Sequence, residues 1–155
     1  MHKDELRELY RELILDHAKS PRHFGKLDDA THSAQGINPL CGDKLTLYLA
    51  LDDGNVRDAA FEGSGCAISV ASASLLTDTI IGAPVDTALN YFDAVTSRLT
   101  SEHSAAERAD LDLDKLRALD GVREFPSRVK CATLAWHALH SAIQGKSIPV
   151  STEQD

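Results

Sequence analysis

The sequence predicts an α+β fold in which a small three-stranded antiparallel sheet is packed by helices. Residues 44–51 alternate between leucine and other residues, the period of two expected of a half-buried strand. Residues 52–55 (Asp-Asp-Gly-Asn) then favour a hairpin turn, and residues 56–61 read as a second strand. Residues 4–19 and 127–143 instead carry apolar side chains at helical spacings of three and four. Because a short turn joins the strands, we expect an antiparallel meander.

The N-terminal helix is expected to bury one stripe and to end before Pro21, because the residue before a proline avoids the helical region. Six residues form the predicted stripe: Leu6, Leu9, Tyr10, Leu13, Ile14 and His17. Residues 21–40 contain two prolines and two glycines and show no period. They are therefore predicted to form a long ordered loop, a kind of segment that is often functional.

Further helices are expected after the hairpin. A short third strand is predicted at Cys66–Ser69, followed by a helix rich in small residues that ends at Ile81. Another helix is predicted from Val85, a short helical segment near residues 113–119, and a last helix from Ser127 that ends at Gly145. We expect one domain over residues 1–148 and a C-terminal tail over residues 149–155.

Composition argues against several classes of protein. A net charge of −8 and an aromatic content of 5% do not suit a nucleic-acid binder. No stretch approaches about 18 apolar residues, and acidic residues near the N-terminus stand where a signal peptide would be apolar. Three cysteines cannot form a fully paired disulfide framework. We therefore expect a cytoplasmic protein with reduced thiols.

The three cysteines occupy contexts that are poor core sequences. Cys41 precedes a glycine and Asp43, Cys66 follows Gly-Ser-Gly, and Cys131 lies about one turn into the last predicted helix. A meander can bring the start of its first strand and the end of its second to one sheet edge. If the last helix packs there, three sulfurs and one carboxylate could complete a tetrahedral site for Zn²⁺ or an iron–sulfur cluster. Free cysteines are also often small buried hydrophobes, so spacing alone leaves both interpretations open.

A series of motifs is more specific. The chain resembles the IscU/NifU N-terminal family of iron–sulfur cluster assembly, and most closely its SufU branch. The resemblance covers almost the whole chain and is carried by Leu9-Tyr10, Ile14–His17, Ser20–Gly25, Asn38–Asp43, Phe61–Ser69, Ala71–Thr77 and Phe125–Trp136. It implies an IscU/SufU-like fold and a metal site made by Cys41, Asp43, Cys66 and Cys131.

The resemblance also implies a reaction and partners. A SufU-type protein docks on a SufS-type, pyridoxal-phosphate-dependent cysteine desulfurase, and a histidine of that partner replaces Cys41 on a bound Zn²⁺. The freed Cys41 then accepts sulfur as a persulfide. The chain would thus be a zinc-dependent, sulfurtransferase-type sulfur carrier that supplies a downstream SufBCD-type cluster scaffold.

Two departures from IscU-type scaffolds favour this branch. Such scaffolds carry histidine just before the third cysteine, where this chain has Lys130, and the stretch between Gly82 and Pro126 is longer than they need. An alternative function is a scaffold that assembles a [2Fe–2S] cluster directly on the Cys/Asp site. A structural zinc module that serves only in protein interactions is a further alternative.

Basic residues and histidines complete the set of candidates. Arg128 and Lys130 flank Cys131 and could contact an acidic partner, although a solvated helix end explains them equally well. His17 lies on the predicted apolar stripe and is expected to be a core histidine. His137 and His140 are too far along the last helix to join Cys131 at one metal, so surface or packing roles are expected.

Overall fold

The computed structural model describes residues 3–39, 42–100, 113, 115–123, 125–145 and 150–151, without the side chains of residues 3–7 and 150–151. Five helical elements accompany four strands in the described part: α1 (Lys3–Lys19), β1 (His32–Asn38), β2 (Asp43–Asp52), β3 (Asn55–Ser64), α2 (Ala67–Ile80), α3 (Val85–Thr100), the 3₁₀-helix η1 (Lys115–Val122), α4 (Pro126–Gln144) and β4 (Val150–Ser151). Among these helices, none is both long and apolar enough to cross a membrane.

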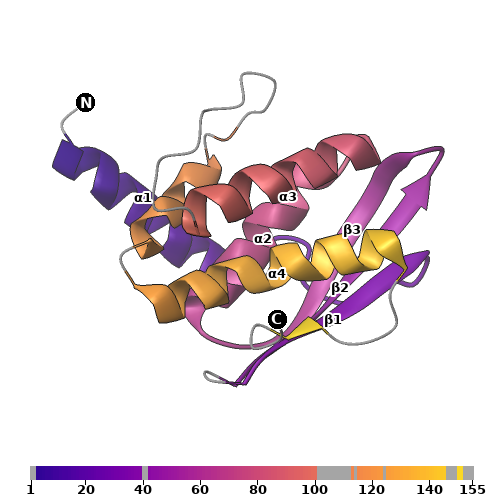
Figure 1. Ribbon diagram of the computed structural model, residues 1–155, viewed down its shortest axis with the longest axis horizontal. Helices are drawn as coiled ribbons and strands as arrows, with labels where there is room; N and C mark the ends of the chain where they lie inside the picture. Colours follow the sequence, from indigo (N-terminus) through magenta and orange to yellow (C-terminus); the bar gives the residue numbers. More distant parts are fainter. Residues whose placement is uncertain are drawn as a thin grey trace.

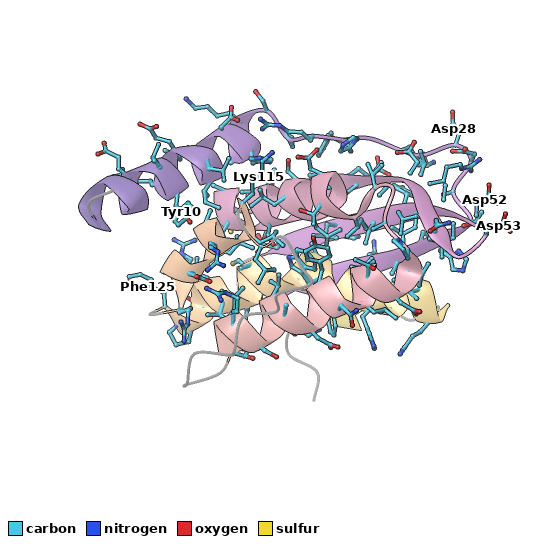
Figure 2. All side chains as sticks on the ribbon, turned by 90° about the horizontal axis from the view of Figure 1, so that it is seen from above. Tyr10, Asp28, Asp52, Asp53, Lys115 and Phe125 are labelled. Atoms are coloured by element: carbon cyan, nitrogen blue, oxygen red, sulfur yellow. The ribbon has the colours of Figure 1, made fainter. Side chains whose placement is uncertain are left out.

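The sheet has the strand order β3-β2-β1-β4, with three antiparallel strands and the short β4 parallel to β1. The α+β class and the three-stranded antiparallel sheet are therefore confirmed. Asp52 pairs with Asn55, and both Asp53 (φ 52°) and Gly54 (φ 77°) are left-handed, as a two-residue type I′ hairpin turn requires. Figure 2 shows Asp52 and Asp53 at this hairpin, with Phe125 at the opposite end of the molecule.

One strand lies where a loop was predicted. Residues 32–38, inside the predicted 21–40 loop, form β1, which pairs with β2 from His32↔Leu49 to Asn38↔Asp43. The buried positions of β1 are Ala34, Gly36 and Asn38. Because small and polar residues fill these positions, the strand shows no hydrophobic alternation in the sequence.

The predicted strand at Cys66–Ser69 is wrong. Cys66 is instead the N-cap of α2, and the helix begins at the next residue. The small residues that follow Cys66 pack inside a helix, and α2 is buried along most of its length. The three antiparallel strands are thus β1, β2 and β3, so their predicted number is right although one strand is misplaced, and the short parallel β4 adds a fourth strand to the sheet.

Helices α2 and α4 pack against the sheet and against each other, while α1 packs on α2 and η1 (Figure 1). The core between these layers includes Leu47, Leu49, Leu76 and Trp136, all fully buried. Trp136 Nε1 donates a hydrogen bond to Ser72 Oγ at 3.1 Å, which satisfies its polar atom inside the core. The α4 helix can lie close to β1 because Gly36 has no side chain; a Cβ there would be 3.0 Å from Leu134 Cδ1.

The predicted stripe of the first helix is confirmed in part. Ile14 and His17 are buried, and Tyr10 and Leu13 are half-buried against the core. Leu9 does not belong to the stripe, because 48% of its surface is exposed. The side chain of Leu6 lies outside the described residues.

Candidate metal centre

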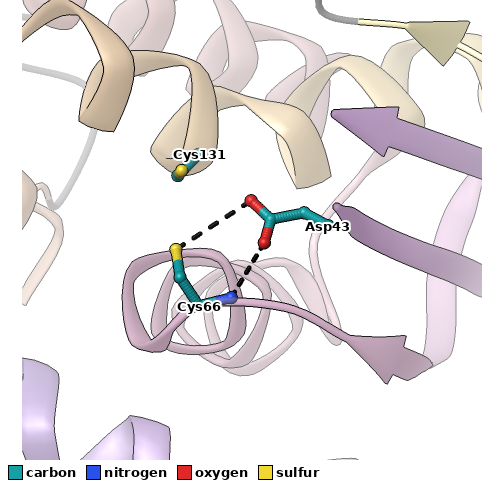
Figure 3. Close-up of side chains that lie close together, drawn as sticks. All are labelled: Asp43, Cys66 and Cys131. Atoms are coloured by element: carbon teal, nitrogen blue, oxygen red, sulfur yellow. Dashed lines mark hydrogen bonds between the residues drawn. The ribbon is translucent and has the colours of Figure 1, made fainter. Parts of the chain in front are cut away.

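Three elements that are distant in the sequence bring Asp43, Cys66 and Cys131 together. Asp43 begins β2, Cys66 caps the start of α2, and Cys131 lies near the start of α4. One carboxylate oxygen and the two sulfur atoms all lie within 4.8 Å of one another (Figure 3). Asp43 and Cys131 are buried and Cys66 is half-buried, so Cys66 is the most exposed of the three residues.

The backbone of residues 63–66 lies very close to Asp43 and to β2, and two glycines make this possible. Gly63 has φ 141°, and a Cβ there would be 2.1 Å from the Lys44 carbonyl oxygen. A Cβ on Gly65 would be 2.6 Å from Asp43 Oδ1. The Gly-Ser-Gly-Cys sequence therefore lets the chain pass close beside β2 and turn into α2 with the carboxylate against its backbone.

Hydrogen bonds hold both oxygens of the Asp43 carboxylate. The backbone N–H of Cys66 donates to Oδ1 at 2.8 Å. Ser69 Oγ donates to Oδ2 at 2.6 Å, and the amide nitrogen of Asn38 lies 3.5 Å from the same oxygen. Burial alone would raise the pKa of Asp43, but the hydrogen bonds from Ser69, Cys66, Cys131 and Asn38 outweigh it and the pKa is lowered. The Asp43 carboxylate is therefore anionic at neutral pH, the form in which it could bind a metal ion.

Cys131 has the opposite electrostatic character. Burial raises the pKa of its thiol well above the ordinary value, and the neighbouring Cys66 and Asp43 raise it further. The side-chain amide of Asn38 lies 3.6 Å from Cys131 Sγ. A metal ion that binds here must displace the thiol proton, as is general for cysteine ligands.

The donor set suits zinc. Two cysteine sulfurs and one carboxylate oxygen are ligands that Zn²⁺ takes in proteins, whereas Ca²⁺ and Mg²⁺ prefer sites made of oxygen atoms. Asp43, Cys66 and Cys131 could supply three ligands of a tetrahedral site. Cys41, the fourth ligand expected from the sequence, lies outside the described residues.

The other sequence candidates lie in three different settings. Arg128 is exposed and Lys130 half-exposed at the start of α4, next to Cys131. His17 is buried with its Nδ1 2.6 Å from Ser74 Oγ, which confirms the core role. His137 and His140 both pack on Phe92, with ring centroids 5.6 and 4.8 Å away, which confirms packing roles.

Two residues of the site were not singled out from the sequence. Ser69 and Asn38 both contact Asp43 Oδ2, and both are buried. The signal for Ser69 was its position three residues after Cys66, since residues at that spacing share a helix face. Asn38 stood within the motif around Cys41, but nothing in its spacing indicated a buried amide.

Comparisons with known proteins agree with the fold and show the family. Residues 9–147 match the NifU-like N-terminal domain family. The chain is 44% identical over 137 residues to the zinc-dependent sulfurtransferase SufU of Bacillus subtilis, covering 87% of this chain and 89% of the relative. It is 41% identical over 141 residues to the iron–sulfur cluster assembly scaffold protein IscU of Thermotoga maritima, covering 91% and 96%.

Solved structures show the same architecture. The crystal structure of FiSufU from Fervidobacterium islandicum, described as an iron–sulfur cluster assembly scaffold protein for the SUF system, superposes with a TM-score of 0.76 at 32% identity. The match covers 88% of this chain and 98% of that one. The chain belongs to the NifU-like N-terminal domain family, which it shares with the IscU and SufU proteins of iron–sulfur cluster assembly.

Proposed function

We propose that this protein is a zinc-dependent sulfur carrier that accepts persulfide sulfur from a pyridoxal-phosphate-dependent cysteine desulfurase for iron–sulfur cluster assembly. The observation that carries the proposal is the convergence of Asp43, Cys66 and Cys131 within 4.8 Å. The 44% identity to a zinc-dependent sulfurtransferase supports zinc as the metal. Membership of the family supports a desulfurase as the sulfur donor.

The proposed ligands are Asp43, Cys66 and Cys131, with Cys41 as the fourth. Cys41 precedes Asp43 by two residues in the sequence and supplies the third sulfur of the set. When bound, Zn²⁺ would keep the cysteine ligands deprotonated without taking part in redox chemistry. The buried amide of Asn38, 3.6 Å from Cys131 Sγ, would orient that sulfur for the role.

The proposed sulfur acceptor is Cys41. Its thiolate attacks the terminal sulfur of the desulfurase persulfide, so that a new S–S bond forms on Cys41 as the donor S–S bond breaks. The donor cysteine leaves as a thiolate, and the transferred sulfur keeps its proton as a Cys41 persulfide. Exchange of this kind needs a thiolate nucleophile and no external oxidant.

The proposed docking surface includes the start of α4. Arg128 is exposed there and Lys130 half-exposed, beside the ligand Cys131, on a protein whose net charge is −8. A basic rim can orient an acidic partner even where the rest of the surface repels it. We place the reaction in the cytoplasm and the next sulfur acceptor in a SufBCD-type cluster scaffold.

A second candidate function is a scaffold that assembles a [2Fe–2S] cluster on the same residues. It is favoured by the 41% identity to an IscU scaffold protein, close to the 44% found for the sulfurtransferase. Lys130 argues against it, because a protonated lysine cannot replace the histidine ligand expected of IscU-type scaffolds at this position.

One set of measurements separates the two functions. Metal content is determined on the purified protein, cysteine turnover by a SufS-type desulfurase is measured with and without it, and iron and sulfide are added anaerobically. A sulfur carrier contains one zinc per chain, stimulates turnover and forms no stable coloured cluster. A Cys41→Ser variant should lose the stimulation. A stable cluster without stimulated turnover would instead establish the scaffold.

A further inference from the structure

Ser69 touches groups from all three elements that form the metal centre. It lies in the first turn of α2, and its side chain is buried at 3% exposure. The hydroxyl oxygen is 2.6 Å from Asp43 Oδ2, 3.3 Å from the Cys131 carbonyl oxygen and 3.7 Å from Cys66 Sγ. One hydroxyl thus connects β2, the start of α2 and α4.

The two oxygens of Asp43 have different partners. Oδ1 accepts a hydrogen bond from the backbone N–H of Cys66, which the start of α2 holds in place. Oδ2 accepts from Ser69 and lies 3.9 Å from Cys66 Sγ, on the side of the sulfur atoms (Figure 3). The terminal torsion of an aspartate is otherwise broad, so these two bonds fix the plane of the carboxylate.

A serine hydroxyl donates one hydrogen and can rotate between acceptors. Asp43 Oδ2 is the nearer acceptor, and the hydrogen bond to it is strengthened by charge. The carbonyl of Cys131 is the second acceptor within reach. Ser69 therefore keeps a partner if Asp43 turns away, and the buried hydroxyl is not left unsatisfied when the carboxylate changes its contacts.

We propose that Ser69 is a positioning residue for the metal ligand Asp43, an inference that rests on the proposed function. Its hydroxyl presents Oδ2 as a single-oxygen ligand beside the two sulfurs, and it sets how tightly and for how long the metal is held. Hydrogen-bond partners of metal ligands typically change metal affinity about 10- to 100-fold when they are removed.

The test compares three variants of the full chain. Ser69→Ala removes the hydroxyl, and Ser69→Thr keeps it. Ser72→Ala is the matched control, because Ser72 is equally buried one turn along α2 but bonds to the Ala132 carbonyl and Trp136 instead of the metal centre. Zinc affinity is measured by competition with a chromophoric chelator. The absorption bands of the Co²⁺-substituted proteins report ligand geometry independently of activity.

We expect Ser69→Ala to bind zinc about 10-fold more weakly and to show displaced Co²⁺ ligand-field bands. Ser69→Thr and Ser72→Ala should keep the affinity and spectrum of the wild type. The role of Ser69 is overturned if Ser69→Ala and Ser72→Ala have the same zinc affinity and the same Co²⁺ bands. It is also overturned if Ser69→Thr binds zinc as weakly as Ser69→Ala. A wild-type protein that takes up neither Zn²⁺ nor Co²⁺ with thiolate charge-transfer absorption overturns the proposed function itself.

Discussion

Gly65 is a single residue that allows the backbone to lie against the metal centre. Its position is so close to Asp43 that a Cβ would lie 2.6 Å from Oδ1. The nearest atoms all belong to the Asp43 side chain (Oδ1 at 2.6 Å, Cγ at 3.1 Å and Cβ at 3.2 Å), so an added Cβ displaces the carboxylate before it displaces the backbone. Gly65 is therefore required by the site more than by the fold.

We expect Gly65→Ala to lower zinc affinity at least about 10-fold, because a displaced carboxylate no longer faces the sulfurs. The free energy of unfolding of the metal-free protein should fall by only about 1–3 kcal/mol, the cost of a lost hydrogen bond to a charged group. Chelator competition and urea denaturation measure the two quantities. Gly121→Ala is the control, since a Cβ there meets nothing within 4 Å and should change neither.

His17 makes stability depend on pH. Burial, and then the charge of Arg22, lower the pKa of His17 below its ordinary value of about 6.5. Below that pH the unfolded chain binds a proton that the folded chain does not, so the free energy of unfolding falls as the pH drops from about 6.5 towards the lowered pKa. Above pH 6.5 the residue has no such effect.

A His17→Gln variant should therefore lose less stability between pH 7 and pH 5.5 than the wild type, as measured by urea denaturation of the metal-free protein. His32→Gln serves as the control, because His32 is the first residue of β1 and its ring nitrogen contacts Thr31 Oγ1 at the surface. The assignment would be wrong if His17→Gln and the wild type lost equal stability over this range.

At the scale of elements, one ion pair joins α3 to η1. Arg98 Nε and a terminal guanidinium nitrogen donate to the two oxygens of Asp120 at 3.2 and 2.5 Å. The side chains are 18% and 31% exposed, so water screens the pair only in part. Arg57 and Asp29 form a comparable contact at 2.9 Å, but their side chains are 49% and 61% exposed.

Arg98→Lys should cost about 1 kcal/mol of unfolding free energy, because lysine cannot make the two-pronged contact. Arg57→Lys should change it by less than about 0.5 kcal/mol, as for most exposed pairs. Equal effects of the two substitutions in chemical denaturation would mean that the α3–η1 pair contributes no more than a surface contact.

The elements also show which parts of the fold the sequence can predict. The β2–β3 hairpin and α4 follow from strong leucine alternation, a turn sequence with glycine, and a long apolar stripe that ends at Gly145. β1 could not be predicted in the same way, because its buried positions hold Ala34, Gly36 and Asn38. Gly36 allows the close approach of Leu134, and Asn38 lies 3.6 Å from Cys131 Sγ; only the tertiary structure defines these contacts.

The candidate metal centre could also be predicted from the sequence only in part. Asp43, Cys66 and Cys131 were identified from glycine-flanked contexts and from the family motifs, and the structure brings them together. Ser69 and Asn38 were missed as site residues, because hydroxyl and amide side chains have many roles and only their distances to Asp43 single them out. Cys41 as a ligand and as the acceptor stays a prediction.

At the scale of the molecule, the metal centre joins elements that are far apart in the sequence. Its described members lie on β2, at the start of α2 and on α4, between residues 43 and 131. An unfolded chain does not hold these groups together, so metal binding and folding are linked. A ligand at 100 times its dissociation constant stabilises the folded state by about 2.7 kcal/mol.

Zinc at that excess should therefore raise the thermal midpoint measured by circular dichroism, and a chelator should reverse the rise. Mg²⁺ should leave the midpoint unchanged, because thiol sulfurs are poor ligands for it. Cys66→Ser is the matched variant: Cys66 is half-exposed, so its replacement should remove the zinc effect with little change in the metal-free midpoint. An equal zinc effect in this variant would contradict the assignment of Cys66 as a ligand.

The indole of Trp136 gives the protein a reporter of its own. The chain has one tryptophan, it is fully buried, and it lies on α4 five positions after Cys131. The tryptophan fluorescence of this protein thus comes from one indole in the core, on the helix that also carries Cys131. Unfolding exposes this indole to water, so its emission can follow unfolding in real time, without a dye or an introduced label.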